Sequence, residues 1–177
     1  MSLLGNRVVR TEDPRFLTGK SEYVADLDLG DAAEVVYVRA PMAHAEIAGI
    51  ETGDAESMPG VLAVVTAADL GVGPTKPRFP IPNLSGAPLL AEDRVRFVGE
   101  PVVAVVAETT GEALDAAESV FVDYQPLPVL VDVGDALADD TLLFPDFGSN
   151  TVMAIPAREE IDFSGCEVMI YEHFVNQ

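Results

Sequence analysis

Residues Val95–Pro128 read VRFVGEPVVAVVAETTGEALDAAESVFVDYQPLP, and they contain in order the signals of a strand, a turn, a second strand, a helix and a third strand. Val102–Ala107 is an almost unbroken run of β-branched residues and alanine, which is typical of a strand covered on both faces. Thr109 stands three residues before Glu112, the spacing of a capping box at the start of a helix. This part of the sequence predicts a β-turn-β-α-β unit around which the remaining chain packs.

The helix and the last strand of this unit follow from side-chain spacing. Leu114, Ala117 and Phe121 recur at helical intervals, so we expect the helix to turn these three side chains toward the sheet. Residues 120–124 show the alternation of a strand that overlaps the last helical turn. Pro126 ends this strand, because proline cannot donate a hydrogen bond to a neighbouring strand.

Similar patterns predict the other elements. Strands are expected at 34–40, 45–51, 61–66 and 168–175, and short helices at 52–58, 66–70 and 132–138. A second β-α-β-like unit results, so the predicted fold class is α+β, with a mixed sheet and short helices. Residues 1–30 read as an extended arm on the domain surface. Residues 71–91 carry five prolines, and so long a loop within a domain is usually functional, bound to a partner or disordered.

The composition is strongly acidic, with 30 acidic and 10 basic residues and a formal net charge of −20. Such a surface repels phosphate backbones, so nucleic acid and anionic membranes are not expected as partners. The acidic composition and the low lysine content fit either adaptation to high salt or a GC-rich genome, in which Arg codons replace Lys codons. We expect no membrane span, because no apolar run approaches the ~20 residues that a span needs. We expect no signal peptide, because the N-terminus shows no basic region followed by an apolar stretch. Cys166 is the only cysteine, which fits the reducing cytoplasm.

From its residues, the chain is predicted to contain no catalytic, cofactor-binding or metal-binding residue. The Gly71–Gly73 sequence is followed by Pro74, which prevents the helix start that a dinucleotide site needs. The two histidines and Cys166 are scattered along the chain, so they do not form a metal-ligand pattern.

Two polar residues leave alternatives open. Glu100 lies between Gly99 and Pro101, and the residue before a proline is held extended. Its carboxylate is therefore either aimed for catalysis or, as we prefer, bonded to neighbouring backbone at the bend between two strands. Gly99 indicates either a positive φ or a close backbone approach. His44 follows Pro41 at a strand junction and is either a base or, as we prefer, a turn-capping or surface histidine.

Short motifs recur through the chain in a particular order. They are GNR at 5–7, DPRFLTG at 13–19, VRAP at 38–41, AHA at 43–45, MPGV at 58–61, VR at 95–96, VGEPV at 98–102, AAE at 116–118, VDY at 122–124, LP at 127–128, GSN at 148–150 and FVNQ at 174–177. In order and spacing they resemble the large subunit of aerobic-type carbon monoxide dehydrogenases. Those enzymes belong with the aldehyde oxidases and xanthine dehydrogenases, the molybdenum hydroxylases. The resemblance covers nearly the whole chain; Ala40 stands where the family more often has Ser.

The resemblance implies a particular domain layout. Residues 1–150 correspond to an α/β-hammerhead domain that includes the N-terminal arm 1–30. Residues 151–177 correspond to a linker and the first strand of a truncated molybdopterin-binding domain. Arg7, Gly19, His44, Gly99, Glu100 and Pro101 belong to the matching motifs, and they are candidates for structural motifs or interfaces rather than for catalysis.

The resemblance also implies the chemistry of the complete enzyme. That chemistry is hydroxylation at molybdenum held by a molybdopterin cytosine dinucleotide, with electrons passing through a [2Fe–2S] subunit to a flavin (FAD) subunit. The family's cofactor-binding segments and catalytic glutamate lie downstream of the hammerhead domain. We therefore expect this chain alone to be inactive and to bind no cofactor.

Two hypotheses of function follow. In the first, the chain is the N-terminal, non-catalytic portion of the large subunit of a molybdenum-dependent hydroxylase or dehydrogenase. The complete enzyme would oxidise carbon monoxide, an aldehyde or a heterocycle. In the second, it is a free-standing, non-catalytic module that docks partner subunits. The strand predicted at 168–175 is left unfinished at Gln177, which favours the first hypothesis.

Overall fold

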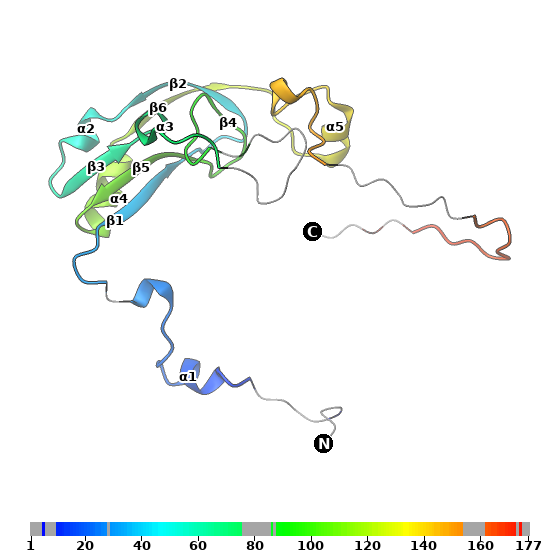
Figure 1. Ribbon diagram of the computed structural model, residues 1–177, viewed down its shortest axis with the longest axis horizontal. Coiled ribbons are helices and arrows are strands. Elements are labelled where there is room, and N and C mark those ends of the chain that lie inside the picture. The colour runs from blue at the N-terminus through cyan, green and yellow to red at the C-terminus, as the bar shows by residue number, and fades with distance from the viewer. Residues whose placement is uncertain are drawn as a thin grey trace. The chain divides into compact units, whose positions relative to one another are not determined.

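The computed structural model describes residues 5, 10–27, 29–75, 86, 88–153, 162–172 and 174 of the chain. Its helices are α1 (Asp13–Leu17), α2 (Gly53–Glu56), α3 (Ala67–Leu70), α4 (Thr110–Glu118) and α5 (Val133–Ala138), with single 3-10 turns η1 (Val24–Asp26) and η2 (Pro145–Phe147) (Figure 1). Its strands are β1 (Glu34–Arg39), β2 (Ala45–Glu51), β3 (Val61–Val65), β4 (Arg94–Val95), β5 (Pro101–Ala107) and β6 (Phe121–Pro126). Short helices mixed with strands make this the expected α+β class.

The described strands form two three-stranded sheets, in the orders β1-β5-β3 and β4-β2-β6. Strand β3 pairs antiparallel with β5, and β2 pairs antiparallel with β4. Each predicted β-α-β-like unit therefore leads from one sheet to the other, as β2-α2-β3 and as β5-α4-β6. Side-chain alternation fixes which face a residue lies on but not which strand it pairs with, so the sequence alone could not reveal this division.

The chain falls into two compact units. The first comprises Met1–Val38, Glu51–Val65 and Ala104–Phe121, and the second comprises Arg39–Ile50, Thr66–Val103 and Val122–Gln177. The division falls within β1, β2, β5 and β6, so each of these four strands contributes residues to both units.

The core of the first unit lies between the β1-β5-β3 sheet and helices α2 and α4. Ala55 of α2, Val105 of β5 and Ala116 of α4 are fully buried and form one cluster. The two helices contact each other, and both contact β3 (Figure 1). Partly buried apolar side chains surround the cluster: Val38, Met58, Val61, Val64, Ala117 and Val120. Alanine at both helix positions keeps these side chains short where the two helices meet the sheet.

Two helices begin at the residues that the sequence indicated. The N-cap of α4 is Thr109, whose Oγ1 accepts a hydrogen bond from the Glu112 backbone N–H at 3.3 Å. The Thr109 hydroxyl in turn donates to the Glu112 carboxylate at 2.8 Å. Thr52 precedes α2 as predicted, but its hydroxyl donates to the Glu56 carboxylate at 2.6 Å and caps no backbone N–H.

Helix α4 faces the core with different side chains from those predicted. Ala113 and Ala116 are its buried residues, whereas Leu114 is 51% exposed. Phe121, at the start of β6, is 58% exposed. The predicted stripe of Leu114, Ala117 and Phe121 is therefore wrong for its two large members. Apolar character alone predicts that stripe, whereas the helix packs on the sheet through its alanines, which are its smallest side chains there.

The second unit contains the β4-β2-β6 sheet, except for Glu51 and Phe121, and the first residues of β5. Its buried apolar residues are Ala40, Ala45, Leu90, Ala91, Val95, Val102 and Val103. Val95, Val102 and Val103 are completely buried, and they belong to the motifs on either side of the Gly-Glu-Pro turn. The residues around this turn thus supply much of the core of the second unit, as the sequence predicted.

The two ends of the chain differ from expectation. The arm contains α1 and η1 and is not simply extended; Pro14 near the start of α1 was the available signal. Residues 168–172 and 174 have no regular secondary structure, so the strand predicted at 168–175 is wrong over these residues. Their apolar side chains are exposed, Ile170 by 78%, and a strand needs a hydrogen-bonded neighbour, which the described residues do not provide for this segment.

Candidate functional site

The Gly99–Pro101 turn is held against the end of β1 by reciprocal backbone hydrogen bonds. Gly99 N–H donates to the Ala40 carbonyl at 2.8 Å, and Ala40 N–H donates to the Glu100 carbonyl at 2.9 Å. Arg39 Nη1 donates to the Gly99 carbonyl at 2.8 Å. Gly99 has φ +91°, which confirms the predicted positive φ, but no atom lies within 4 Å of a Cβ placed there. Backbone conformation, and not a close approach, therefore favours glycine at this position.

The Glu100 side chain serves the turn itself. The residue is only 7% exposed, and its Oε2 accepts a short hydrogen bond from the Arg96 backbone N–H. Glu100 N–H donates to the Phe97 carbonyl at 3.2 Å, and the Pro101 carbonyl accepts from Ala91 N–H at 2.8 Å. The preferred interpretation, a carboxylate bonded to neighbouring backbone at the bend, is confirmed.

His44 is buried, with 4% of its surface exposed. Its Nδ1 lies 2.7 Å from the Pro128 carbonyl oxygen, which can only accept, so Nδ1 carries the hydrogen. The His44 carbonyl in turn accepts from Leu127 N–H at 3.0 Å. The surface alternative is therefore wrong, and the histidine instead anchors the chain that leaves β6. The hydrogen-bond partner of the His44 ring is a backbone carbonyl 84 positions away in the chain, and sequence spacing does not reveal so distant a partner.

Two buried polar atoms have no hydrogen-bond partner among the described residues, His44 Nε2 and Tyr124 Oη. Burial raises the pKa of Tyr124, so its hydroxyl stays protonated at neutral pH. His44 directly precedes β2, and Tyr124 lies in β6. The described part of the chain brings no cluster of three or more His, Cys, Asp or Glu side chains together that could hold a metal ion. Cys166 is exposed and unpaired with another cysteine.

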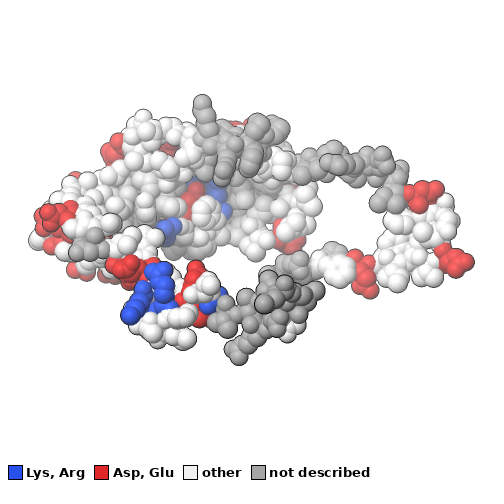
Figure 2. Space-filling view, turned by 60° about the horizontal axis from the view of Figure 1, so that its bottom comes forward, with Lys and Arg blue, Asp and Glu red and all other residues white. Residues whose placement is uncertain are grey.

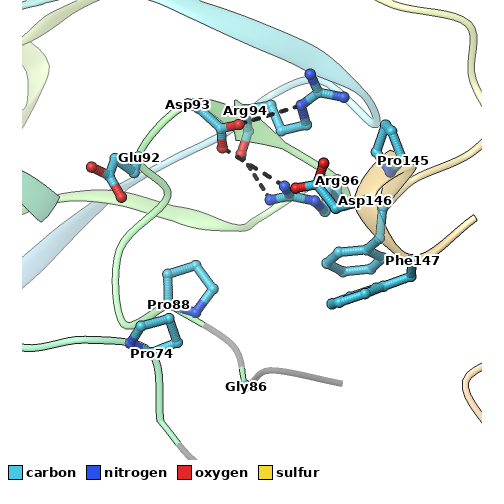
Figure 3. Close-up of a pocket in the computed structure, with 11 residues that line it drawn as sticks. Pro74, Gly86, Pro88, Glu92, Asp93, Arg94, Arg96, Pro145, Asp146 and Phe147 are labelled. Carbon is cyan, nitrogen blue, oxygen red and sulfur yellow. Dashed lines mark hydrogen bonds and ion pairs between the residues drawn. The ribbon is translucent and has the colours of Figure 1, made fainter. Parts of the chain in front are cut away.

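A cavity of about 350 Å³ lies in the second unit (Figure 3). Its lining consists of Pro74, Gly86, Pro88, Glu92, Asp93, Arg94, Arg96, Phe144, Pro145, Asp146 and Phe147. Asp93 lies between the two arginines, 3.6 Å from Arg94 Nε and 3.7 Å from Arg96 Nη2. Asp93 thus pairs with both arginines of the cavity lining, which also contains the carboxylates of Glu92 and Asp146.

The Arg96 side chain connects the turn to the segment after α5. Its Nε donates to the Leu143 carbonyl at 3.1 Å, and its guanidinium carbon lies 4.7 Å from the centre of the Phe144 ring. Phe144 stacks on Phe147, with ring centres 5.5 Å apart. A guanidinium over an aromatic face is a favourable cation–π contact. Sequence reasoning missed this role, although a basic residue three positions before the Gly-Glu-Pro motif was a signal.

Asn150 closes the segment that contains α5 and η2. Its Oδ1 accepts from Leu143 N–H at 3.0 Å, and its Nδ2 donates to the carbonyls of Thr141 at 2.7 Å and Ala136 at 3.2 Å. All the side-chain atoms of this asparagine that can form hydrogen bonds are therefore engaged with backbone. The Gly-Ser-Asn motif at 148–150 was noted in the sequence without a role, and this network supplies one.

Asp139 completes the same network from the end of α5. Its carboxylate accepts from Asn150 N–H and from the Ser149 hydroxyl, both at 2.7 Å. These two hydrogen bonds, the backbone one first, lower the pKa of Asp139. Asp139 also adopts a left-handed conformation, with φ 57°, which only a small polar side chain tolerates well.

The arm carries a further candidate, Gly19, at the end of α1. Its φ is +66°, and its N–H donates to the Phe16 carbonyl at 3.2 Å, as expected for a glycine that ends a helix. Leu17 is 86% exposed. Arg7 lies outside the described residues. Acidic side chains are distributed over the face shown in Figure 2 and do not gather in one patch.

The chain is an α+β domain in which several of the sequence motifs build turns and backbone junctions. Among those residues, no helix has the length and apolar character to cross a membrane. The motif residues Gly99, Glu100, Pro101 and His44 lie within the second unit, whereas Gly19 lies in the arm of the first.

Comparison with known proteins identifies the family. The family model for the aldehyde oxidase and xanthine dehydrogenase a/b hammerhead domain matches residues 18–128. The chain is 43% identical to the carbon monoxide dehydrogenase large chain of Afipia carboxidovorans, over 88% of this chain and 19% of that protein. It is 42% identical to the nicotine 6-hydroxylase large subunit of Paenarthrobacter nicotinovorans, over 74% of this chain and 16% of that protein.

Solved structures give the same result. Reconstituted CO dehydrogenase from Oligotropha carboxidovorans matches 77% of this chain and 17% of its own, with a TM-score of 0.63 and 42% identity. The aldehyde oxidoreductase from Desulfovibrio desulfuricans matches 82% of this chain and 17% of its own, with a TM-score of 0.67 and 29% identity. The chain belongs to the aldehyde oxidase and xanthine dehydrogenase hammerhead family, and the expected hammerhead fold is confirmed. It spans less than a fifth of the length of the two curated relatives named above.

Proposed function

We propose that this chain is the N-terminal, non-catalytic portion of the large subunit of a molybdenum-dependent hydroxylase. One observation carries the proposal: identity above 40% to two large subunits whose names describe oxidation chemistry, confined to less than a fifth of their length. The role of these residues is then to fold as a hammerhead domain and to support the cofactor-binding remainder of the subunit. Residues 1–150 would form this domain, and residues 151–177 would lead into the next one.

The complete enzyme would carry the redox chemistry. Its substrate class is carbon monoxide, an aldehyde or a heterocycle, because relatives named for each kind of substrate match this chain. A matching solved structure is described as a Cu,Mo-CO dehydrogenase, with 41% identity and a TM-score of 0.62. We place the molybdopterin cytosine dinucleotide with its molybdenum in the remainder of the large subunit. The described residues bring together no group of three or more His, Cys, Asp or Glu side chains that could hold a metal ion directly.

The partners of the complete enzyme are also a proposal. Relatives are named as a large subunit, a large chain and the gamma subunit of a dehydrogenase complex, which supports assembly with other subunits. We propose that these are an iron–sulfur subunit with [2Fe–2S] clusters and a flavin subunit with FAD. The exposed apolar side chains of the arm, such as Leu17 and Val24, fit a surface that such a partner covers. A chain with one cysteine suits the cytoplasm, where we place the enzyme.

The decisive experiment begins with the gene. If the reading frame continues beyond codon 177, the complete subunit is produced with its neighbouring subunits and analysed for molybdenum. Stoichiometric molybdenum, with dye reduction by one of the three substrate classes, supports the proposal. The chain of 177 residues, purified as the matched control, should contain no molybdenum and reduce no dye. A reading frame that ends at codon 177 would overturn the proposal in favour of a free-standing docking module, as would stoichiometric molybdenum in the control.

A further inference from the structure

No further inference is drawn: the strongest candidate, the cavity of the second unit that Arg96 and the Phe144 ring help to line, carries nothing, because its lining includes Gly86 and Pro88, which adjoin residues outside the described ranges, and nothing in the structure shows what covers it.

Discussion

Glu100 fixes the backbone at Arg96: its buried carboxylate accepts the Arg96 N–H, and the Arg96 side chain then lies over the Phe144 ring. One carboxylate thus sets the start of the turn and positions the guanidinium that reaches the segment after α5. The turn is also tied to β1 through Gly99 and Ala40. A motif that looked in sequence like a possible acid–base site is instead a junction between distant segments.

Replacing Glu100 with alanine should destabilise the chain by roughly 2–3 kcal/mol, because the Arg96 N–H loses a charged acceptor in a buried position. Glu100→Gln keeps an acceptor oxygen and should cost about 1 kcal/mol. Urea denaturation measures both free energies, with Glu118→Ala, an exposed glutamate, as the control expected to change little. Equal losses in the two Glu100 variants would show that the hydrogen bond contributes nothing.

Gly99 provides a test of backbone strain without crowding. Because φ is +91° and no atom lies within 4 Å of an added Cβ, the cost of a side chain is conformational. Gly99→Ala should therefore lose about 1–2 kcal/mol. Gly99→Val should lose somewhat more, since a β-branched residue tolerates this conformation less well. The close backbone approach that the sequence left open at Gly99 is absent, so crowding adds nothing to this cost.

The matched control for Gly99 is Gly111→Ala in the first turn of α4. Gly111 has no positive φ and equally open space around an added Cβ. Alanine there should be neutral or stabilising by up to about 1 kcal/mol, because it is the better helix former. A Gly99→Ala variant as stable as wild type in the same denaturation series would contradict the strain argument.

Asp139 should make stability depend on pH. Its hydrogen bonds to Asn150 N–H and the Ser149 hydroxyl lower its pKa in the folded state. A carboxyl group whose pKa is lower when folded stabilises the protein above its unfolded pKa of about 3.9, and that contribution is lost as pH falls through the folded pKa. Asp139→Asn should therefore be less stable than wild type at neutral pH, and the gap should narrow below about pH 4.

The comparison isolates Asp139, because both proteins share the other acidic residues with lowered pKa values, Asp69 and Asp162. Asparagine also tolerates the left-handed conformation at this position, so backbone strain contributes equally to the stability of both proteins and does not affect their difference. Unfolding free energies of the two proteins are measured by urea denaturation between pH 3 and pH 7. A gap that stays constant over this range would show that charge plays no part.

The features that were predictable share one property: they depend on residues close together in the chain. The Thr109 cap, the positive φ of Gly99 and the backbone role of Glu100 each follow from a few neighbouring residues. The features that were missed depend on distant partners. Arg96 meets Leu143 47 positions away, and His44 meets Pro128 84 positions away. Periodicity carries no information on such pairs, and it also cannot choose between two sheets.

The packing of α4 shows a second limit of sequence reasoning, and it gives the last prediction. Leu114 was expected in the core but is half exposed, whereas Ala116 is completely buried against Val105 and Ala55. Leu114→Ala should therefore cost less than about 1 kcal/mol, far below the 2–5 kcal/mol of a leucine removed from a core. Ala116→Val should cost about 1–3 kcal/mol, because added methyl groups have no space in a packed cluster. The two variants, compared by denaturant unfolding, should rank in this order. The reverse order would mean that α4 faces the sheet with its leucine, and that the sequence pattern identified the core correctly.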